Sequence, residues 1–206
     1  MHIKRQNIDK TLPIPRKGTK YVVVASHDAK NGVPLLIILR DILKIAENRK
    51  EVRRILQEKL VNLNNKQVRR ENFSVLPFDL IKIGDKSYEL GFSDKGKFEV
   101  KETSRKEMIL KIIGKRILKN KKVQLNFLYG KNLISDEKVN IGDSAVIKEK
   151  KITEILRLEK GKEAAIFVGK YKGKRGTIEK IENKMAVLEC GKKKINIPVK
   201  NIMVVK

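Results

Sequence analysis

The segment GKYKGKRGTI, residues 169–178, carries the most information about the fold. It joins two apolar segments, 164–168 and 178–181, whose length and composition predict β-strands. Its glycines permit backbone conformations that other residues avoid, so the segment predicts a strand–loop–strand whose loop offers N–H groups and cations to phosphate. A glycine-rich hairpin with a merely soluble surface is the alternative. The predicted phosphate contacts are Lys170, Lys172, Lys174 and Arg175, and the predicted backbone-shape positions are Gly169, Gly173 and Gly176.

Short strands are predicted over most of the second half of the chain. Apolar residues alternate with polar ones from residue 81 to 100 and again from 123 to 127, with turns at Gly84, Gly96 and Gly130. A further set of strands is expected between residues 145 and 206, at a spacing typical of small barrels. The strongly basic segment 111–122 is expected to be a loop or a short helix.

Two helices are predicted between residues 34 and 60. Pro34 suits the first turn of a helix, and apolar residues recur at helical spacing up to Ala46. Asn48 is a candidate N-cap with Glu51 three residues later, which is close to a capping box. The second helix should then place its cations opposite its apolar side. These cations are Arg49, Lys50, Arg53 and Arg54.

A tight hairpin is predicted directly after the second helix, over residues 61–68. Its central asparagines, Asn64 and Asn65, tolerate the left-handed conformation that such a turn requires. Arg69 and Arg70 follow the hairpin at once. The preceding segment, residues 1–33, is interrupted by Pro13 and Pro15 and is expected to be a basic extension without a regular helix.

The charge of the chain indicates a polyanionic partner. The 206 residues include 49 Lys and Arg against 24 Asp and Glu, for a net charge of +25. The excess is +5 in residues 1–33, +4 in 34–80, +7 in 81–150 and +9 in 151–206. A spread of this kind favours contact at many points with a long polyanion over binding through one basic tail. Since no segment approaches the ~20 apolar residues of a membrane span, the polyanion is expected to be a nucleic acid and not a membrane.

Residue types that catalysis or metal binding would need are scarce. The sequence has two histidines, one cysteine and none of the common hydrolase, zinc-protease or nucleotide-binding motifs. We therefore expect no catalytic residues, no metal, no cofactor and no small-molecule substrate. A single cysteine, Cys190, fits a reducing cytoplasm and excludes an internal disulfide.

Several segments together resemble one protein family. Residues 165–181 resemble a KOW motif, and residues 48–56 with the hairpin at 61–68 resemble an S-four-type RNA-binding module. In this order they resemble the archaeal and eukaryotic small-subunit ribosomal proteins of family S-four-e. Segments 2–5, 16–23, 34–40 and 140–143 are similar to that family as well. Asn65 stands where such hairpins often have glycine.

The resemblance implies a multi-module α+β protein that is a structural constituent of the small ribosomal subunit. The implied modules are a basic N-terminal extension (1–33), a small helical S-four-like module with a hairpin (34–80), a central antiparallel β domain (81–150) and a C-terminal SH3-like KOW β-barrel (151–206). The implied partners are small-subunit ribosomal RNA and neighbouring ribosomal proteins, in the cytoplasm. The basic positions of the extension that would face RNA are Lys4, Arg5, Arg16, Lys17 and Lys20.

Two other classes of protein remain open at this point. A KOW-bearing transcription or ribosome-assembly factor would show a similar charge and similar motifs without being part of the ribosome. S-four modules also accompany RNA-modifying enzymes, but these carry a separate catalytic domain. The remaining β segments of this chain show no cluster of residues that would form one, so we expect no enzyme.

Overall fold

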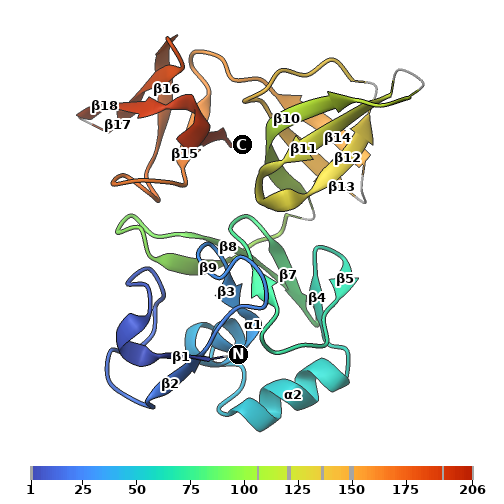
Figure 1. The fold of residues 1–206 in the computed structure, drawn as a ribbon, viewed down its shortest axis with the longest axis vertical. Coiled ribbons are helices and arrows are strands. Elements are labelled where there is room, and N and C mark those ends of the chain that lie inside the picture. Colours follow the sequence, from blue (N-terminus) through green and yellow to red (C-terminus); the bar gives the residue numbers. More distant parts are fainter. Residues whose placement is uncertain are drawn as a thin grey trace. The chain divides into compact units, whose positions relative to one another are not determined.

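The computed structural model of the chain describes residues 2–105, 107–119, 122–135, 137–148, 151–191 and 193–205. The chain forms two compact units, Met1–Lys106 and Glu107–Lys206 (Figure 1). Both units are built mainly of antiparallel strands. Among the described residues, α2 (Arg49–Gln57) is the longest helix, so the protein is mostly β with few helices and several sheets.

The first unit contains a two-stranded pairing near the N-terminus, a second short pairing, and a larger antiparallel sheet in the order β5-β4-β7-β8-β9. Its strands are β1 (His2–Lys4), β2 (Tyr21–Val23), β3 (Val33–Pro34), β4 (Val61–Leu63), β5 (Lys66–Gln67), β6 (Ser74–Val75), β7 (Leu80–Ile83), β8 (Lys86–Phe92) and β9 (Phe98–Glu102). The alternation predicted for residues 81–100 is confirmed by β7, β8 and β9, which pair in register.

One apolar core holds the first unit together. Val52 and Leu56 of α2 lie in the same buried cluster as Leu63, Ile81 and Leu90 of the sheet. Residues of the predicted N-terminal extension, among them the buried Val22, belong to this cluster too. Because these residues lie in the apolar cluster, the extension is a packed part of the unit. Burial of its apolar side chains stabilises the fold by roughly 25 cal/mol per Å².

The predicted capping box is confirmed at the start of α2. The Glu51 backbone N–H donates to Asn48 Oδ1 at 3.0 Å, and the Glu47 backbone N–H donates to Glu51 Oε2 at 2.8 Å. The helix predicted over residues 35–46 is much shorter than expected. It consists of α1 (Leu35–Ile37) and a π-helical turn, η2 (Ile38–Ile42), and the chain then takes a left-handed conformation at Lys44, φ +53°, which ends it.

The predicted hairpin after α2 is confirmed. Strands β4 and β5 pair antiparallel, and the two residues between them, Asn64 and Asn65, both have positive φ, at +51° and +62°. Two successive left-handed residues match the twist of the flanking strands. Asn65 therefore takes a left-handed conformation that glycine would also adopt.

The second unit consists of two antiparallel sheets, in the orders β12-β11-β10-β13-β14 and β18-β17-β16-β15-β19. Their strands are β10 (Met108–Ile117), β11 (Val123–Phe127), β12 (Asn132–Ser135), β13 (Ser144–Lys148), β14 (Lys151–Leu156), β15 (Glu163–Ile166), β16 (Arg175–Glu182), β17 (Met185–Cys190), β18 (Lys193–Pro198) and β19 (Ile202–Val204). Val146 and Leu156 of the first sheet lie in the apolar cluster of the second.

The prediction for the basic segment 111–122 was wrong over most of its length. Residues 111–117 form most of β10, while Asn120 and Lys121 lie outside the described residues. The register of β10 against β11 shifts between Ile112 and Gly114. Such a bulge breaks the alternation by which a strand is recognised in a sequence.

The module boundaries expected from the sequence fall within paired sheets. β7 contains residues 80 and 81 and pairs with β4. Likewise β14, which begins at Lys151, pairs with β13 of the central sheet. The one division between compact units falls after Lys106.

Candidate nucleic-acid interface

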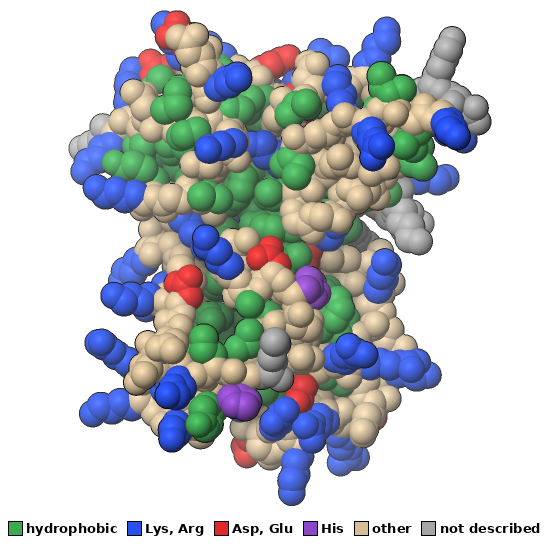
Figure 2. Space-filling view, viewed as in Figure 1, with side chains coloured by type: hydrophobic (Ala, Val, Ile, Leu, Met, Phe, Trp, Pro, Cys, Tyr) green, Lys and Arg blue, Asp and Glu red, His purple; other side chains and the backbone are tan. Residues whose placement is uncertain are grey.

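The predicted RNA-binding cations are fixed in three places on the first unit and in one loop of the second. Lys and Arg side chains are spread over the visible face of both units and do not gather in one patch (Figure 2). Among the described residues, no group of acidic, His or Cys side chains could hold a metal ion, and no helix is long and apolar enough to span a membrane. The Lys and Arg side chains of this face offer positive charge and hydrogen-bond donors.

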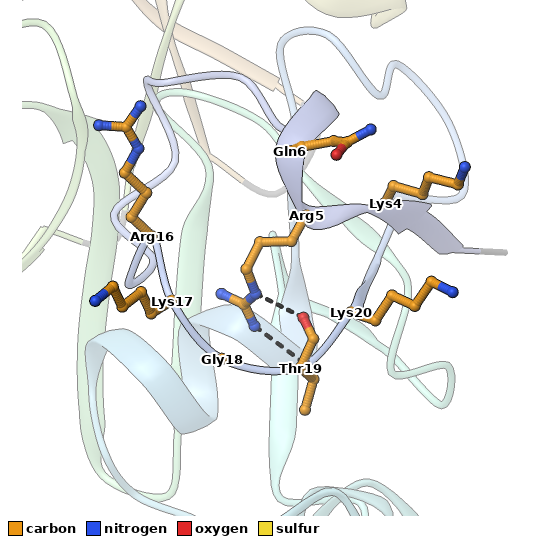
Figure 3. Close-up of a pocket in the computed structure, with 8 residues that line it drawn as sticks. All are labelled: Lys4, Arg5, Gln6, Arg16, Lys17, Gly18, Thr19 and Lys20. Atoms are coloured by element: carbon orange, nitrogen blue, oxygen red, sulfur yellow. Dashed lines mark hydrogen bonds between the residues drawn. The ribbon is translucent and has the colours of Figure 1, made fainter.

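The N-terminal cations surround one pocket. Antiparallel pairing of β1 with β2 places Lys4 opposite Tyr21, which brings the start of the chain beside the loop that precedes β2. The pocket has a volume of about 470 Å³. Its lining residues are Lys4, Arg5, Gln6, Arg16, Lys17, Gly18, Thr19 and Lys20 (Figure 3). All five cations predicted in this segment line the pocket, and none of the described residues that line it is acidic.

Arg5 differs from the other cations of the pocket because its donors are used within the protein. Its Nε donates to the Thr19 carbonyl oxygen at 2.7 Å, and its Nη1 donates to the Pro15 carbonyl oxygen at 2.6 Å. Its Nη2 donates to Thr19 Oγ1 at 3.0 Å. The prediction that Arg5 contacts RNA thus meets a side chain that already binds its own loop.

Two of the four cations on α2 are bound to an acidic residue that the sequence did not single out. Glu71 accepts hydrogen bonds from Arg49, whose Nε lies 2.8 Å away, and from Arg53, whose Nε lies 3.0 Å away. The Glu71 side chain is 13% exposed, whereas those of both arginines are more than half exposed. The predicted cationic side of the helix therefore exists, but Glu71 compensates part of its charge.

The Glu71 contacts alter its acidity. The hydrogen bond from Arg49, aided by Arg53 and by the positive charge of both, lowers the pKa of Glu71 from 4.5 to about 2, and burial opposes this only in part. The same contact raises the pKa of Arg49. Glu71 is therefore charged at neutral pH. Arg54 is paired too, with Glu58 at 2.9 Å, but in an exposed i,i+4 pair of small energetic value.

Arg69 and Arg70 follow the hairpin and are both exposed. Hydrogen bonds to residues 79 and 80 hold the hairpin in place. Asn64 Nδ2 donates to Asp79 Oδ1 at 2.9 Å, and the Leu80 backbone N–H donates to Asn64 Oδ1 at the same distance. Asp79 is 2% exposed and also accepts from the Leu76 backbone N–H. This network fixes the position of the turn.

The glycine-rich loop lies between β15 and β16, as predicted. Gly169 and Gly173 have positive φ, at +97° and +93°. The Gly173 backbone N–H donates to the Ile166 carbonyl oxygen at 2.8 Å, which closes the loop. Tyr171 packs partly into the apolar cluster of the second unit, and the Nζ atoms of Lys174 and Lys170 lie 5.6 and 6.0 Å from its ring centre. The loop thus presents cations around an aromatic anchor.

Gly176 has a different role from the one we expected. Its φ is not positive. A Cβ at this position would instead lie 2.5 Å from the Glu189 carbonyl oxygen and 2.7 Å from Cys190 Sγ, both on the neighbouring strand β17. Close approach of two strands, not a left-handed backbone, therefore requires glycine here.

Sequence reasoning missed Lys111, which is 3% exposed on β10. Its Nζ donates to the carbonyl oxygens of Val199 and, at 2.7 Å, of Ile202. Burial lowers the pKa of Lys111 to about 8. This lysine joins the two sheets of the second unit and is not available to a ligand. A lysine in a basic run gives no sign of such burial.

Comparison with known proteins finds one family. The family model Ribosomal family S4e matches residues 84–152. The chain is 32% identical to the small ribosomal subunit protein eS4 of Methanocella arvoryzae over 189 residues, covering 88% of this chain and 81% of that one. It is 33% identical to the protein of the same name from Archaeoglobus fulgidus, covering 87% of this chain and 79% of that one.

A solved structure is similar over most of the chain as well. The crystal structure of the 30S ribosomal protein S4e from Thermoplasma acidophilum matches with a TM-score of 0.73 and 28% sequence identity. The match covers 85% of this chain and 95% of that one. The chain belongs to the S4e family of ribosomal proteins, and the resemblance found in its sequence is confirmed.

Proposed function

We propose that this chain is a structural constituent of the small ribosomal subunit and that it binds small-subunit ribosomal RNA through distributed Lys and Arg contacts to phosphate. Membership of the S4e family carries this proposal. The net charge of +25 supports it, because phosphate contacts supply sequence-independent affinity for nucleic acids. In the same proposal the chain is not an enzyme, works in the cytoplasm and has other ribosomal proteins as neighbours.

The proposed modules follow the expected order along the chain. Residues 34–80 would act as the S-four-like RNA-binding module, with α2 and the β4–β5 hairpin as its recognisable parts. Residues 151–206 would act as the KOW module, with β15, the glycine-rich loop and β16 as the motif within an SH3-like barrel. The residues before and between them, 1–33 and 81–150, would serve as the basic extension and the central β domain.

The described contacts rank the predicted RNA-binding residues. Exposed cations without a carboxylate partner among the described residues can give their full charge to phosphate; they include Lys50, Arg69, Arg70, Lys170 and Arg175. Arg49 and Arg53 would contribute less, because Glu71 already compensates part of their charge. The ranking predicts that Arg69→Gln with Arg70→Gln weakens RNA binding more than Arg49→Gln with Arg53→Gln.

Co-sedimentation is the test of the proposal. Tagged protein expressed in an archaeal host should move with the mature small subunit in a gradient run at low salt, at which contacts to phosphate persist. A protein that is absent from the mature subunit under these conditions, or that follows RNA polymerase or immature particles, would be a transcription or assembly factor. That outcome would overturn the proposed function.

A further inference from the structure

The N-terminal pocket contains a cation whose position the RNA-binding role does not explain. Arg5 is half-buried at its centre, while Lys4, Arg16, Lys17 and Lys20 are exposed around it. Figure 3 shows the Arg5 side chain directed at Thr19, with Arg16 and Lys17 on one side and Lys4 and Lys20 on the other. Lys4 and Arg5 lie at the start of the chain, whereas Arg16, Lys17 and Lys20 lie in the loop before β2, so the cations share one pocket only if this loop is held against the N-terminus.

Arg5 supplies that restraint. Its guanidinium contacts the two ends of the segment 15–19 through the carbonyl oxygens of Pro15 and Thr19. Its backbone N–H adds a bond of 2.9 Å to the Lys20 carbonyl oxygen. A planar guanidinium with several fixed donors can reach the Pro15 and Thr19 oxygens at the same time, and the ammonium of lysine cannot. The acceptors are neutral, so the guanidinium keeps its full charge inside the pocket.

Gly18 shows how closely the segment passes the guanidinium. Its φ is +143°, and a Cβ at this position would lie 3.0 Å from Arg5 Nη2. A side chain here would be strained by this backbone conformation and would press against the guanidinium. The sequence therefore provides both the Arg5 guanidinium and, at Gly18, the space that it occupies.

The four outer cations keep their charge uncompensated. In the part of the chain that the structure describes, none of Lys4, Arg16, Lys17 and Lys20 forms an ion pair, in contrast to Arg49 and Arg53 on α2. Four like charges held around a fifth repel one another, and this repulsion is relieved when an anion enters. The pocket thus carries positive charge that the fold itself leaves unbalanced.

We propose that this pocket is a preformed site for the phosphates of an RNA strand, that Arg16, Lys17, Lys4 and Lys20 contact the phosphates, and that Arg5 is a positioning residue that does not touch the RNA. The inference rests on the proposed function, since it names the site by which the protein would hold one strand of ribosomal RNA. It separates the N-terminal cations into those that bind and the one that shapes.

A double-mutant cycle on the full-length protein tests this assignment, with small-subunit ribosomal RNA transcribed in vitro as the probe. Arg16→Gln with Lys17→Gln should make the negative slope of log affinity against log salt shallower by about 1.5, as expected for two lost phosphate contacts. Arg5→Lys keeps the positive charge but loses the planar guanidinium. Like the Arg16 and Lys17 pair, it should weaken RNA binding and make the salt dependence shallower. Added to the first pair, Arg5→Lys should have no further effect, because the Arg5 guanidinium holds only the segment 15–19. Lys4 and Lys20 are held without it, by the pairing of β1 with β2 and by the Arg5 backbone N–H, which the substitution keeps.

Lys10→Gln is the matched control, because Lys10 is an exposed cation of the same segment outside the pocket. It should change the slope by less than half as much as the Arg16 and Lys17 pair. A further loss of affinity when Arg5→Lys is added to that pair would show that Arg5 touches the RNA and would overturn the positioning role. A wild-type slope in the Arg16 and Lys17 variant would overturn the site while leaving the proposed function intact. Absence of salt-dependent binding by the wild-type protein would instead overturn the proposed function.

Cleavage by trypsin after Arg16 and Lys17 provides a second test. RNA should protect the peptide bonds that follow these two residues, because a strand engages several of the cations together. Inorganic phosphate at equal phosphate concentration should not protect them. Equal protection by phosphate alone would make the pocket a site for the free ion and would overturn its assignment to RNA.

Discussion

Replacement of Glu71 by Gln tests how the structure divides the charge of α2 between stability and binding. The substitution keeps the size of the side chain but removes the charge that both arginines contact. The folded pKa of Glu71, about 2, lies below its ordinary value of 4.5, so its interactions favour the charged form. A shift of this size corresponds to an upper limit of about 3 kcal/mol. Since both guanidinium groups are more than half exposed and screened by water, we expect a loss of about 1–2 kcal/mol.

The pH dependence has a definite sign. A carboxylate whose pKa is depressed on folding stabilises the fold above its unfolded pKa, and this contribution is lost as the pH falls through its folded pKa. The difference in stability between wild type and Glu71→Gln should therefore be largest above about pH 5 and should shrink between pH 4.5 and about 2. Hydrogen exchange of the α2 amides measures it locally, without requiring both units to unfold together.

Glu58→Gln is the matched control on the same helix. Glu58 pairs with Arg54 in an exposed i,i+4 arrangement, for which we expect a loss of no more than about 0.5 kcal/mol. Glu71→Gln should also increase RNA affinity slightly, since it releases positive charge at the proposed interface. If the two variants lose equal stability, or if the Glu71→Gln difference does not change with pH, the reasoning about Glu71 is refuted.

Three further predictions concern stability at single positions. Asn64→Gly should cost about 1–3 kcal/mol, because buried Asp79 loses a donor, whereas Asn65→Gly should be nearly neutral, since its side chain is exposed and its φ suits glycine; equal losses in thermal melts would contradict this. Gly176→Ala should destabilise the second unit by about 1–3 kcal/mol through overpacking against β17, while Gly114→Ala, where the new Cβ meets nothing nearer than 3.7 Å, should change it by less than about 0.5 kcal/mol; the reverse order in urea titrations would be inconsistent with the strand contact. Lys111 has a folded pKa of about 8, below the ordinary 10.5, so between these two pH values the lysine is protonated only in the unfolded chain. Rising pH should therefore stabilise wild type relative to Lys111→Met by about 1–3 kcal/mol. A difference in stability that stays constant from pH 7.5 to 10.5 would show that Lys111 titrates normally.

The sequence predicted the features that depend on neighbouring residues. The capping box at Asn48 and Glu51, the left-handed turn at Asn64 and Asn65 and the alternating strands after residue 80 all follow from local spacing. In each, the residues that determine the conformation are within a few positions of one another. The resemblance to the S4e family likewise rested on short motifs in a fixed order, and the comparisons confirm it.

Features that depend on distant contacts were missed. Glu71 lies 22 residues after Arg49, and nothing in the sequence distinguishes it from the other acidic residues. Gly176 requires glycine because of a strand that begins nine residues later, and not because of its own φ. Lys111 lies in a basic run that suggested exposure, yet the carbonyls that bind it are 88 and 91 residues away.

The strand β10 shows a related limit. Its bulge between Ile112 and Gly114 shifts the side-chain alternation, so the basic positions that follow did not match a period of two. The helix predicted over residues 35–46 shows the opposite case, in which the apolar period was right but the chain left the helix at Lys44. Apolar periodicity reports which side chains face the core, and Leu35, Leu36, Leu39, Ile42, Leu43 and Ala46 all lie in or against the apolar cluster. It does not report where a helix ends.

The account rests on distributed phosphate contact, and the salt dependence of binding to small-subunit ribosomal RNA tests it most directly. If six to ten phosphates are contacted, the affinity of the purified full-length chain should fall by roughly 10³–10⁵ between about 50 and about 200 mM salt, along a straight line of log affinity against log salt. An affinity that stays constant over this range would contradict the account, since a chain of net charge +25 would then be binding the RNA without using its charge.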